Sequence, residues 1–126
     1  MSEQQQPRAH PRYAIELDAH LLPIGGGAPV VGRTHDISRG GFSLMCPDMA
    51  ELLPPGTVCE VRLSLVFSET EFSEPLVLTG SAMWCTRLKQ GTQVGVRFEG
   101  LDARASGFLD LFIGFLEGGE EDTDRT

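Results

Sequence analysis

The chain has 126 residues, 40% of them hydrophobic and 22% charged, and a formal net charge of −8 at pH 7. This length suits one domain with its own core, and the hydrophobic fraction excludes an intrinsically disordered chain. The negative charge argues against a protein that coats DNA or RNA, because such proteins favour a basic surface.

No segment of the sequence predicts export or membrane insertion. No apolar run approaches the roughly 18 residues that a transmembrane helix needs. The first six residues also lack the charged and apolar regions of a secretory signal. The three cysteines, Cys46, Cys59 and Cys85, are widely spaced in apolar segments, which favours buried, reduced thiols. Reduced thiols indicate a cytoplasmic protein.

The chain begins with a polar segment that shows no periodicity, so residues 1–6 are predicted to be a flexible N-terminus. Pro7 and Pro11 disfavour helix in the residue before each of them. Arg8 and Arg12 are therefore expected on an extended or turned segment. Taken alone, the two arginines are interpreted most simply as a solvated basic segment.

A hairpin is predicted next. Residues 13–19 alternate between apolar and polar side chains and predict the first strand, and 28–36 predicts the second. The loop between them, 21–27, ends in three consecutive glycines. No helix and no Lys-Ser/Thr pair follows these glycines, so they indicate a loop and not a phosphate-binding turn.

The end of the second predicted strand combines polar groups with glycines. Asp36 and Ser38 are two residues apart, so an extended backbone directs both side chains to the same face. Gly40-Gly41 permits a positive φ and a close approach by another molecule. The apolar alternation resumes at Phe42. Such a cluster could hold the edge of a purine base, although by itself it is also ordinary turn chemistry.

The remaining strands are predicted from the same alternation of side chains. They span 42–46, 58–67, 76–87 and 93–98. A proline-rich loop at 47–56 has room for one helical turn, and 68–75 is an acidic turn. Six or seven short strands joined by short connections predict a mainly β protein, an antiparallel β-barrel.

One helix is predicted to close the chain, from residue 103 to 117, with Asp102 as its N-cap. Its apolar positions form a stripe that suits a lid on one mouth of the barrel, with extra width for a partner or a second copy. These positions are Phe108, Leu109, Phe112, Ile113 and Leu116, widened by Leu111 and Phe115. Gly118-Gly119 is expected to end the helix and to begin an acidic tail, 118–126.

Two separated motifs together resemble the signature of a known family. Arg8-x-x-x-Arg12, followed by Asp36-x-Ser38-x-x-Gly41, is similar to the signature of the PilZ domain, a family of small β-barrels that bind cyclic di-GMP. A tryptophan in a late strand, the strand Val94-Gly95-Val96-Arg97-Phe98 and the closing helix also fit. The resemblance covers residues 7–116, which implies a PilZ-like domain at 7–117.

The resemblance implies a ligand and its binding residues. Arg8 and Arg12 would contact the phosphates or the guanine edges of cyclic di-GMP, since a guanidinium suits both. Asp36 would accept hydrogen bonds from guanine, Ser38 would bind beside it, and Gly41 would allow the backbone to approach closely.

Two further residues are assigned to the ligand less directly. Trp84 could stack on a guanine, but a lone tryptophan in a strand equally predicts a core or barrel-rim residue. Arg39 could contact a phosphate.

Metal and catalytic chemistry are not expected. His10, His20 and His35 lack metal-ligand spacing with cysteines or carboxylates, so neither a metal nor any other cofactor is predicted. The segment from His35 to Ser38 contains the residue types of a hydrolase triad. Adjacent residues on a strand point to opposite faces, however, so His35 and Asp36 cannot align with Ser38.

The favoured hypothesis is therefore a cyclic di-GMP receptor that signals to an unidentified protein partner in motility, pilus or surface-behaviour control. A PilZ-like protein-interaction module without nucleotide binding is the alternative. A barrel that binds another nucleotide or single-stranded nucleic acid is disfavoured by the acidity. We expect a monomer or weak homodimer. Family resemblance also implies one ligand per chain, because Pro7 stands where the pair-binding form has an arginine.

Overall fold

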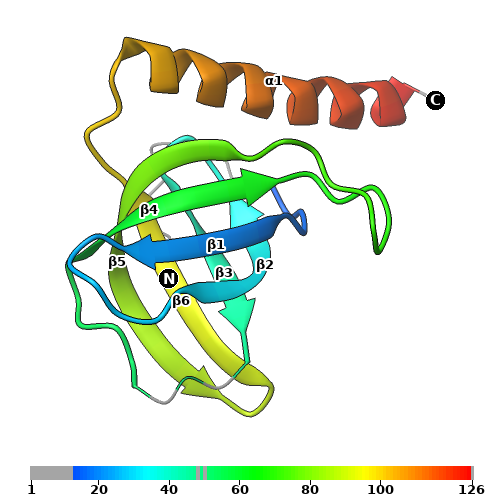
Figure 1. Ribbon diagram of the computed structural model, residues 1–126. Coiled ribbons are helices and arrows are strands. Elements are labelled where there is room, and N and C mark those ends of the chain that lie inside the picture. The colour runs from blue at the N-terminus through cyan, green and yellow to red at the C-terminus, as the bar shows by residue number, and fades with distance from the viewer. Residues whose placement is uncertain (1–12, 48, 50, 126) are drawn as a thin grey trace, which may run out of the picture.

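The computed structural model describes residues 13–47, 49 and 51–125, with side chains described as far as residue 114. Six antiparallel strands form a closed barrel in the order β1-β2-β3-β6-β5-β4, and one helix follows them (Figure 1). The elements are β1 Asp18–Pro23, β2 Val30–Ile37, β3 Gly41–Cys46, β4 Thr57–Ser64, β5 Leu76–Leu88, β6 Gly91–Phe98 and α1 Ala103–Arg125. The predicted β-barrel with a C-terminal helix is confirmed.

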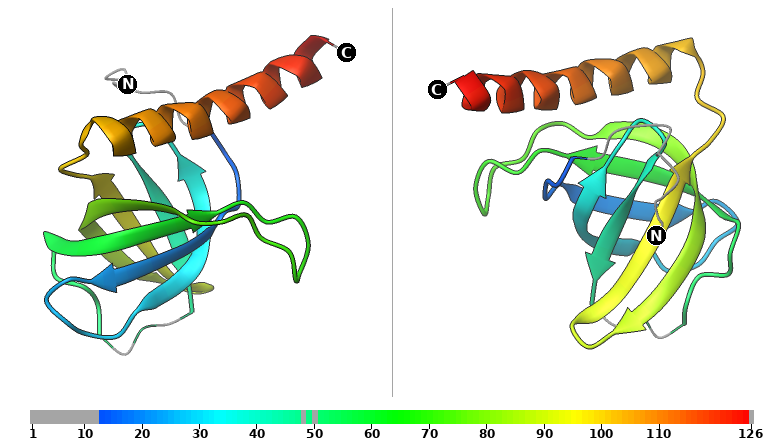
Figure 2. Two further views of the ribbon diagram at one scale, coloured as in Figure 1. Left: turned by 45° about the horizontal axis from the view of Figure 1, so that its top comes forward. Right: turned by 180° about the vertical axis from the view of Figure 1, so that it is seen from behind.

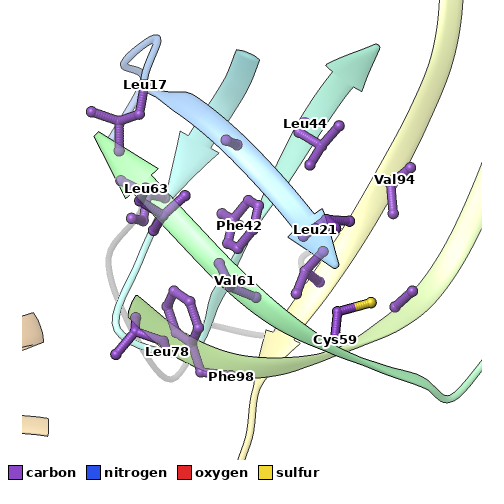
Figure 3. Close-up of a cluster of buried hydrophobic side chains, with 14 of the residues drawn as sticks. Leu17, Leu21, Phe42, Leu44, Cys59, Val61, Leu63, Leu78, Val94 and Phe98 are labelled. Carbon is purple, nitrogen blue, oxygen red and sulfur yellow. The ribbon is translucent and has the colours of Figure 1, made fainter. Parts of the chain in front are cut away.

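The barrel is filled by the apolar side chains of the alternating strands. Leu17, Ala19 and Leu21 are fully buried, as the period-two pattern requires for one face of a strand. Figure 3 shows side chains from several strands meeting in this core. The cluster includes Leu17, Leu21, Phe42, Leu44, Cys59, Val61, Leu63, Leu78, Val94 and Phe98. Burial of Cys46 and Cys59 as free thiols agrees with their sequence context.

The first strand differs from its prediction, because β1 begins at Asp18 and continues into the predicted loop. Thr34 of β2 is the physical reason. Its hydroxyl accepts a hydrogen bond from the Leu17 N–H (2.8 Å) and donates one to the Ile15 carbonyl (2.5 Å). A side chain thereby satisfies backbone groups that a regular ladder would pair. The alternation of burial still extends back to Ile15, which is half-buried.

α1 lies over one end of the barrel, and its second half continues past the barrel edge (Figures 1 and 2). Asp102 is the predicted N-cap: its Oδ1 accepts the Ala105 N–H at 2.8 Å. Leu109 and Ile113 are buried against the barrel core, as expected of a lid. Phe108 is 47% exposed, so its assignment to the buried stripe is wrong.

The predicted end of the helix is also wrong, because α1 continues through Gly118 and Gly119 to Arg125. A glycine inside a helix costs about 1 kcal/mol relative to alanine, which a helix can tolerate. Glycine ends a helix only where it takes a left-handed conformation. Whether residues 118–126 act as a separate tail stays a prediction. Within residues 13–47, 49 and 51–125, no helix has the length and apolar character needed to cross a membrane.

Candidate functional site

Four residues occupy neighbouring positions on four adjacent strands and define the cross-strand row: Asp36, Ser43, Gly95 and Trp84. Asp36 of β2 pairs with Ser43 of β3, Ser43 pairs with Gly95 of β6, and Gly95 pairs with Trp84 of β5. Paired residues in an antiparallel sheet present their side chains to the same face. The row therefore crosses the outer surface of the barrel, over a length of three strand spacings, about 14 Å.

Two β-bulges turn the ends of the row outward. On β2 the register shifts between Thr34 and Asp36. Thr34 points inward and is 2% exposed, so a regular strand would direct Asp36 inward as well. On β5 the register shifts between Ala82, which is 1% exposed, and Trp84. Each bulge adds one residue and reverses the face of the next, as β-bulges beside binding sites do.

Asp36 is oriented by its neighbour in the row. The Ser43 hydroxyl donates a hydrogen bond to Asp36 Oδ1 at 3.0 Å, and Ser43 is only 4% exposed. A buried donor at this position fixes the carboxylate rotamer on the outer face. The sequence analysis missed Ser43, because its partner lies on another strand and only the register reveals it.

The Trp84 indole lies flat over Gly95. A Cβ added at Gly95 would lie 2.2 Å from Trp84 Cε2 and 2.3 Å from Nε1, so only glycine leaves room for the ring. Trp84 is 44% exposed. The sequence analysis left Trp84 between a core or barrel-rim residue and a ligand-stacking residue. The structure excludes the core and places the ring in the cross-strand row, and its contact with a ligand stays a prediction. Gly95 was not predicted as part of the site.

Ser38 and the glycines build the turn that joins β2 to β3. The Ser38 N–H donates to the Gly41 carbonyl at 2.8 Å, and the Gly40 N–H donates to Ser38 Oγ at 3.1 Å. Ser38 is 8% exposed and lies two residues after Asp36 in the chain. Its predicted contact with a ligand stays a prediction.

The glycine at position 41 is required by the barrel itself. A Cβ at Gly41 would lie 2.1 Å from the Val96 carbonyl oxygen of β6, so the close approach is made by this chain's own backbone. Gly41 has no positive φ, which differs from the sequence-based expectation. Glycine is therefore required at position 41 because β6 lies so close, and not because of the conformation of the turn.

Arg39 contacts α1. Its Nε donates to Asp110 Oδ1 at 3.0 Å, and both side chains keep solvent contact. The predicted phosphate contact of Arg39 would thus compete with this ion pair.

Arg97 is a second cation on the outer face. It lies two residues along β6 from Gly95, is largely exposed, and donates to Glu99 Oε2 at 2.9 Å. That hydrogen bond lowers the pKa of Glu99 below its ordinary value, and a hydrogen bond with Ser81 lowers it further by a smaller amount. The sequence analysis named Arg97 only as part of the strand Val94-Gly95-Val96-Arg97-Phe98.

Arg8 and Arg12 lie outside the described residues, so their predicted roles stay predictions. The next residue, Tyr13, is hydrogen-bonded to Ile37 in both directions: its N–H donates at 2.8 Å and its carbonyl accepts at 3.0 Å. Ile37 is the residue between Asp36 and Ser38. The chain that follows Arg12 is thus attached directly to the polar end of β2.

An open cavity of about 970 Å³ lies elsewhere on the barrel, between the β1–β2 and β3–β4 connections. Gly25-Gly26-Gly27 forms part of its lining, together with apolar residues such as Ile24 and Leu52. These glycines are a loop, as predicted, and the cavity contains no residue of the cross-strand row.

Comparison with known proteins gives one family and a consistent fold. The PilZ domain family model matches residues 6–115. No match is found among curated proteins. Three similar solved structures are the PilZ domain of Escherichia coli YcgR with c-di-GMP, the K. pneumoniae MrkH–c-di-GMP complex and the Bacillus subtilis inhibitor of motility MotI/DgrA.

The similarity to these structures is in fold and not in sequence. The YcgR domain has a TM-score of 0.65 at 16% identity, over 96% of this chain and 100% of that one. MrkH has 0.72 at 15% identity, over 93% of this chain, and MotI has 0.68 at 14%, over 91%. The chain spans about half the length of MrkH and MotI, 54% and 53%. Because the family model covers nearly the whole chain, the protein belongs to the PilZ domain family.

Proposed function

We propose that the protein is a cyclic di-GMP receptor that binds the nucleotide on the cross-strand row and signals to a protein partner. The observation that carries the proposal is the pair of β-bulges. They turn a carboxylate, Asp36, and an aromatic ring, Trp84, onto the same outer face of the barrel. An outward-facing indole and an oriented outward-facing carboxylate do not help to fill or close the barrel, so their presence together on the outer face favours a binding role.

Each part of the row has a chemical counterpart in the ligand. Asp36, held by Ser43, would accept hydrogen bonds from the ring N–H and amino groups of one guanine. Trp84 offers a π face to a base, and such stacking contributes about 1–3 kcal/mol per base. Arg8 and Arg12 would bind phosphates or the guanine O6/N7 edge. The Tyr13–Ile37 pairing supports this role, because it brings the chain beside Asp36.

Catalysis is not part of the proposal, and neither is a metal ion. The ligand is recognised and released unchanged, and the receptor acts by altering contact with its partner. Two of the similar structures, YcgR and MrkH, are complexes with c-di-GMP, and a third, MotI/DgrA, is an inhibitor of motility, so we propose a cytoplasmic role in motility or surface behaviour.

One observation favours the alternative, an interaction module without nucleotide binding. Arg39 is already paired with Asp110 of α1, and the Ser38 hydroxyl accepts a hydrogen bond within its own turn. Ser38 of the signature and the less directly assigned Arg39 thus have internal structural uses that require no ligand.

Titration calorimetry with cyclic di-GMP decides between these functions. We expect about one ligand per chain and a loss of about 30-fold or more in affinity for Arg12→Ala, because truncating a charged hydrogen-bonding partner costs roughly 2–5 kcal/mol. Arg62→Ala is the matched control: Arg62 is exposed on β4, bonded to Glu60, and outside the row. Absence of binding by the unaltered chain would leave the interaction module as the better explanation. Binding by Arg12→Ala within about threefold would remove Arg12 from the site.

A further inference from the structure

Arg97 lies beside the signature turn, although the sequence analysis gave it no role in the site. It pairs with Gly41 of β3 on one side and with Ser81 of β5 on the other. The N–H of the next residue, Phe98, donates to the Gly40 carbonyl at 3.0 Å. Backbone hydrogen bonds of the barrel therefore hold the Arg97 backbone against the Asp-x-Ser-x-x-Gly turn.

The Arg97 side chain lies on the same outer face as the cross-strand row. Gly95 and Arg97 are two residues apart on a part of β6 whose pairing with β3 has no register shift, so both face outward. Val96 between them is buried in the core, whereas the Arg97 side chain is 61% exposed. The Gly41–Arg97 pair thus neighbours the Ser43–Gly95 pair of the row, about 7 Å along the strands.

Positive charge is scarce on the strands that form the row. β2, β3, β5 and β6, all within the described residues, contain three arginines and no lysine. Arg33 Nε lies 3.7 Å from Asp18 Oδ1, and Arg33 Nη1 lies 3.9 Å from Glu16 Oε1. Arg87 is the penultimate residue of β5. Arg97 is the arginine that pairs with a residue of the signature, so it is the best placed of the three for a ligand on the row.

Glu99 holds the Arg97 guanidinium through a weak, exposed ion pair. Arg97 Nη2 donates to Glu99 Oε2 at 2.9 Å, with the two side chains 61% and 37% exposed. Exposed ion pairs contribute little stability, so the guanidinium can exchange this partner for a better one. Its planar fork of five N–H donors suits the oxygens of a phosphate. Glu99 has a second hydrogen-bonding partner, Ser81, that it can keep when Arg97 turns away.

We propose that Arg97 binds a phosphate of cyclic di-GMP and that Glu99 competes with this phosphate for the guanidinium. In the free protein Arg97 donates to Glu99, and in the complex it donates to a phosphate oxygen. The ligand would bring two phosphate charges to a face that already contains the Asp36 carboxylate, and a cation there offsets their repulsion. Glu99 therefore lowers the affinity of the site. The inference rests on the proposed function, because it requires a nucleotide on the cross-strand row.

Titration calorimetry with cyclic di-GMP, at about 0.15 M salt, tests the contact of Arg97. Arg97→Ala should weaken binding about tenfold, because it removes a charge-assisted hydrogen bond at a partly exposed position. Arg97→Lys should bind within about threefold of the unaltered chain, since lysine keeps the charge without the planar fork. Arg62→Ala is the matched control, because Arg62 and Glu60 form the same kind of exposed pair, two residues apart, on a strand outside the row. It should change the affinity by less than about twofold.

A double-mutant cycle tests the competition by Glu99. Glu99→Gln should tighten binding about threefold, because it weakens the hold on Arg97. In the Arg97→Ala background the same substitution should change the affinity by less than about 1.5-fold, because its effect acts through Arg97. The control Glu60→Gln should have a similarly small effect. An equal gain from Glu99→Gln in both backgrounds would reduce Glu99 to general charge repulsion and overturn the competition.

Cyclic di-AMP separates a phosphate contact from a guanine contact, because it has the same two phosphates and different bases. Arg97→Ala should weaken the binding of both dinucleotides by the same factor, so that discrimination between them is unchanged. A loss confined to cyclic di-GMP would assign Arg97 to the guanine O6/N7 edge and overturn the phosphate contact.

Failure of this inference and failure of the proposed function give different results. Binding by Arg97→Ala within about twofold of a binding, unaltered chain would refute the role of Arg97 and leave the receptor in place. Absence of binding by the unaltered chain would refute the receptor and, with it, this inference. The substituted side chains are exposed or partly exposed, and circular dichroism verifies that each variant remains folded.

Discussion

Removal of the Trp84 ring is the sharpest test of the cross-strand row. Trp84 is 44% exposed, which for a side chain of about 250 Å² leaves on the order of 110 Å² available to a ligand. Covering that area at about 25 cal/mol per Å² contributes at most about 3 kcal/mol. Measured base stacking, about 1–3 kcal/mol, falls in the same range. We therefore expect Trp84→Ala to lose about 2 kcal/mol, a roughly 30-fold weaker affinity for cyclic di-GMP.

Calorimetry measures the loss, and fluorescence gives an independent reading because Trp84 is the only tryptophan of the chain. Cyclic di-GMP should quench the emission of the unaltered protein. Trp84→Phe, which keeps a smaller ring, should recover part of the affinity. Gly95→Ala should weaken binding without removing the indole, because the added Cβ would lie 2.2 Å from the ring and displace it.

The stacking assignment fails if Trp84→Ala binds cyclic di-GMP within about twofold of the unaltered protein while melting normally. It also fails if emission does not change at saturating ligand. Either result would return Trp84 to the role of a barrel-rim residue that covers Gly95.

Three further predictions concern the site, the barrel and the thiols. Asp36→Ala should weaken cyclic di-GMP binding by about 2 kcal/mol and reduce discrimination against cyclic di-AMP, both measured by calorimetry; undiminished discrimination would disprove the base-reading role. Gly41→Ala should lower the melting temperature by several degrees, whereas Gly107→Ala, in open space on α1, should raise it by favouring helix. Burial raises the pKa of the Cys59 thiol. At about pH 8, Ellman's reagent should therefore label the half-buried Cys85 first and Cys59 only after unfolding. Equal labelling rates for Cys85 and Cys59 in the folded protein would contradict the burial of Cys59.

The fold was predictable because hydrophobic alternation reports burial directly. Strands β2 to β6 and the start of α1 lie where the pattern places them, within a few residues. The shift of β1 was not predictable, because it depends on a hydrogen bond from the Thr34 side chain to a distant segment. The end of α1 was missed for a different reason: paired glycines make a helix stop favourable but not necessary.

The site was predictable only where its residues are close in sequence. Asp36, Ser38 and Gly41 follow from one local motif, but Ser43, Gly95 and Trp84 join Asp36 through strand register. The spacing of inward-facing residues along β2 and β5 does carry a weak signal of the two β-bulges. Inward-facing residues are three apart at Thr34 and Ile37, and again at Ala82 and Cys85, where a regular strand has a spacing of two.

The pairing of Tyr13 with Ile37 also has a consequence for how the two halves of the signature would act on one ligand in the proposed complex. Arg12 is one residue and Arg8 five residues from Tyr13 in the sequence, which limits the distance from Arg8 to the bridge to at most about 18 Å of chain. In the proposed complex, the arginines would meet a nucleotide bound to the barrel as an intramolecular event, at an effective concentration in the millimolar range or above. Lengthening the tether between Arg12 and Tyr13 with glycine and serine should then reduce affinity gradually, roughly as the −3/2 power of its length. In the proposed complex, the bridge would thus let the two arginines bind the ligand more tightly than the same contacts would on an unattached chain.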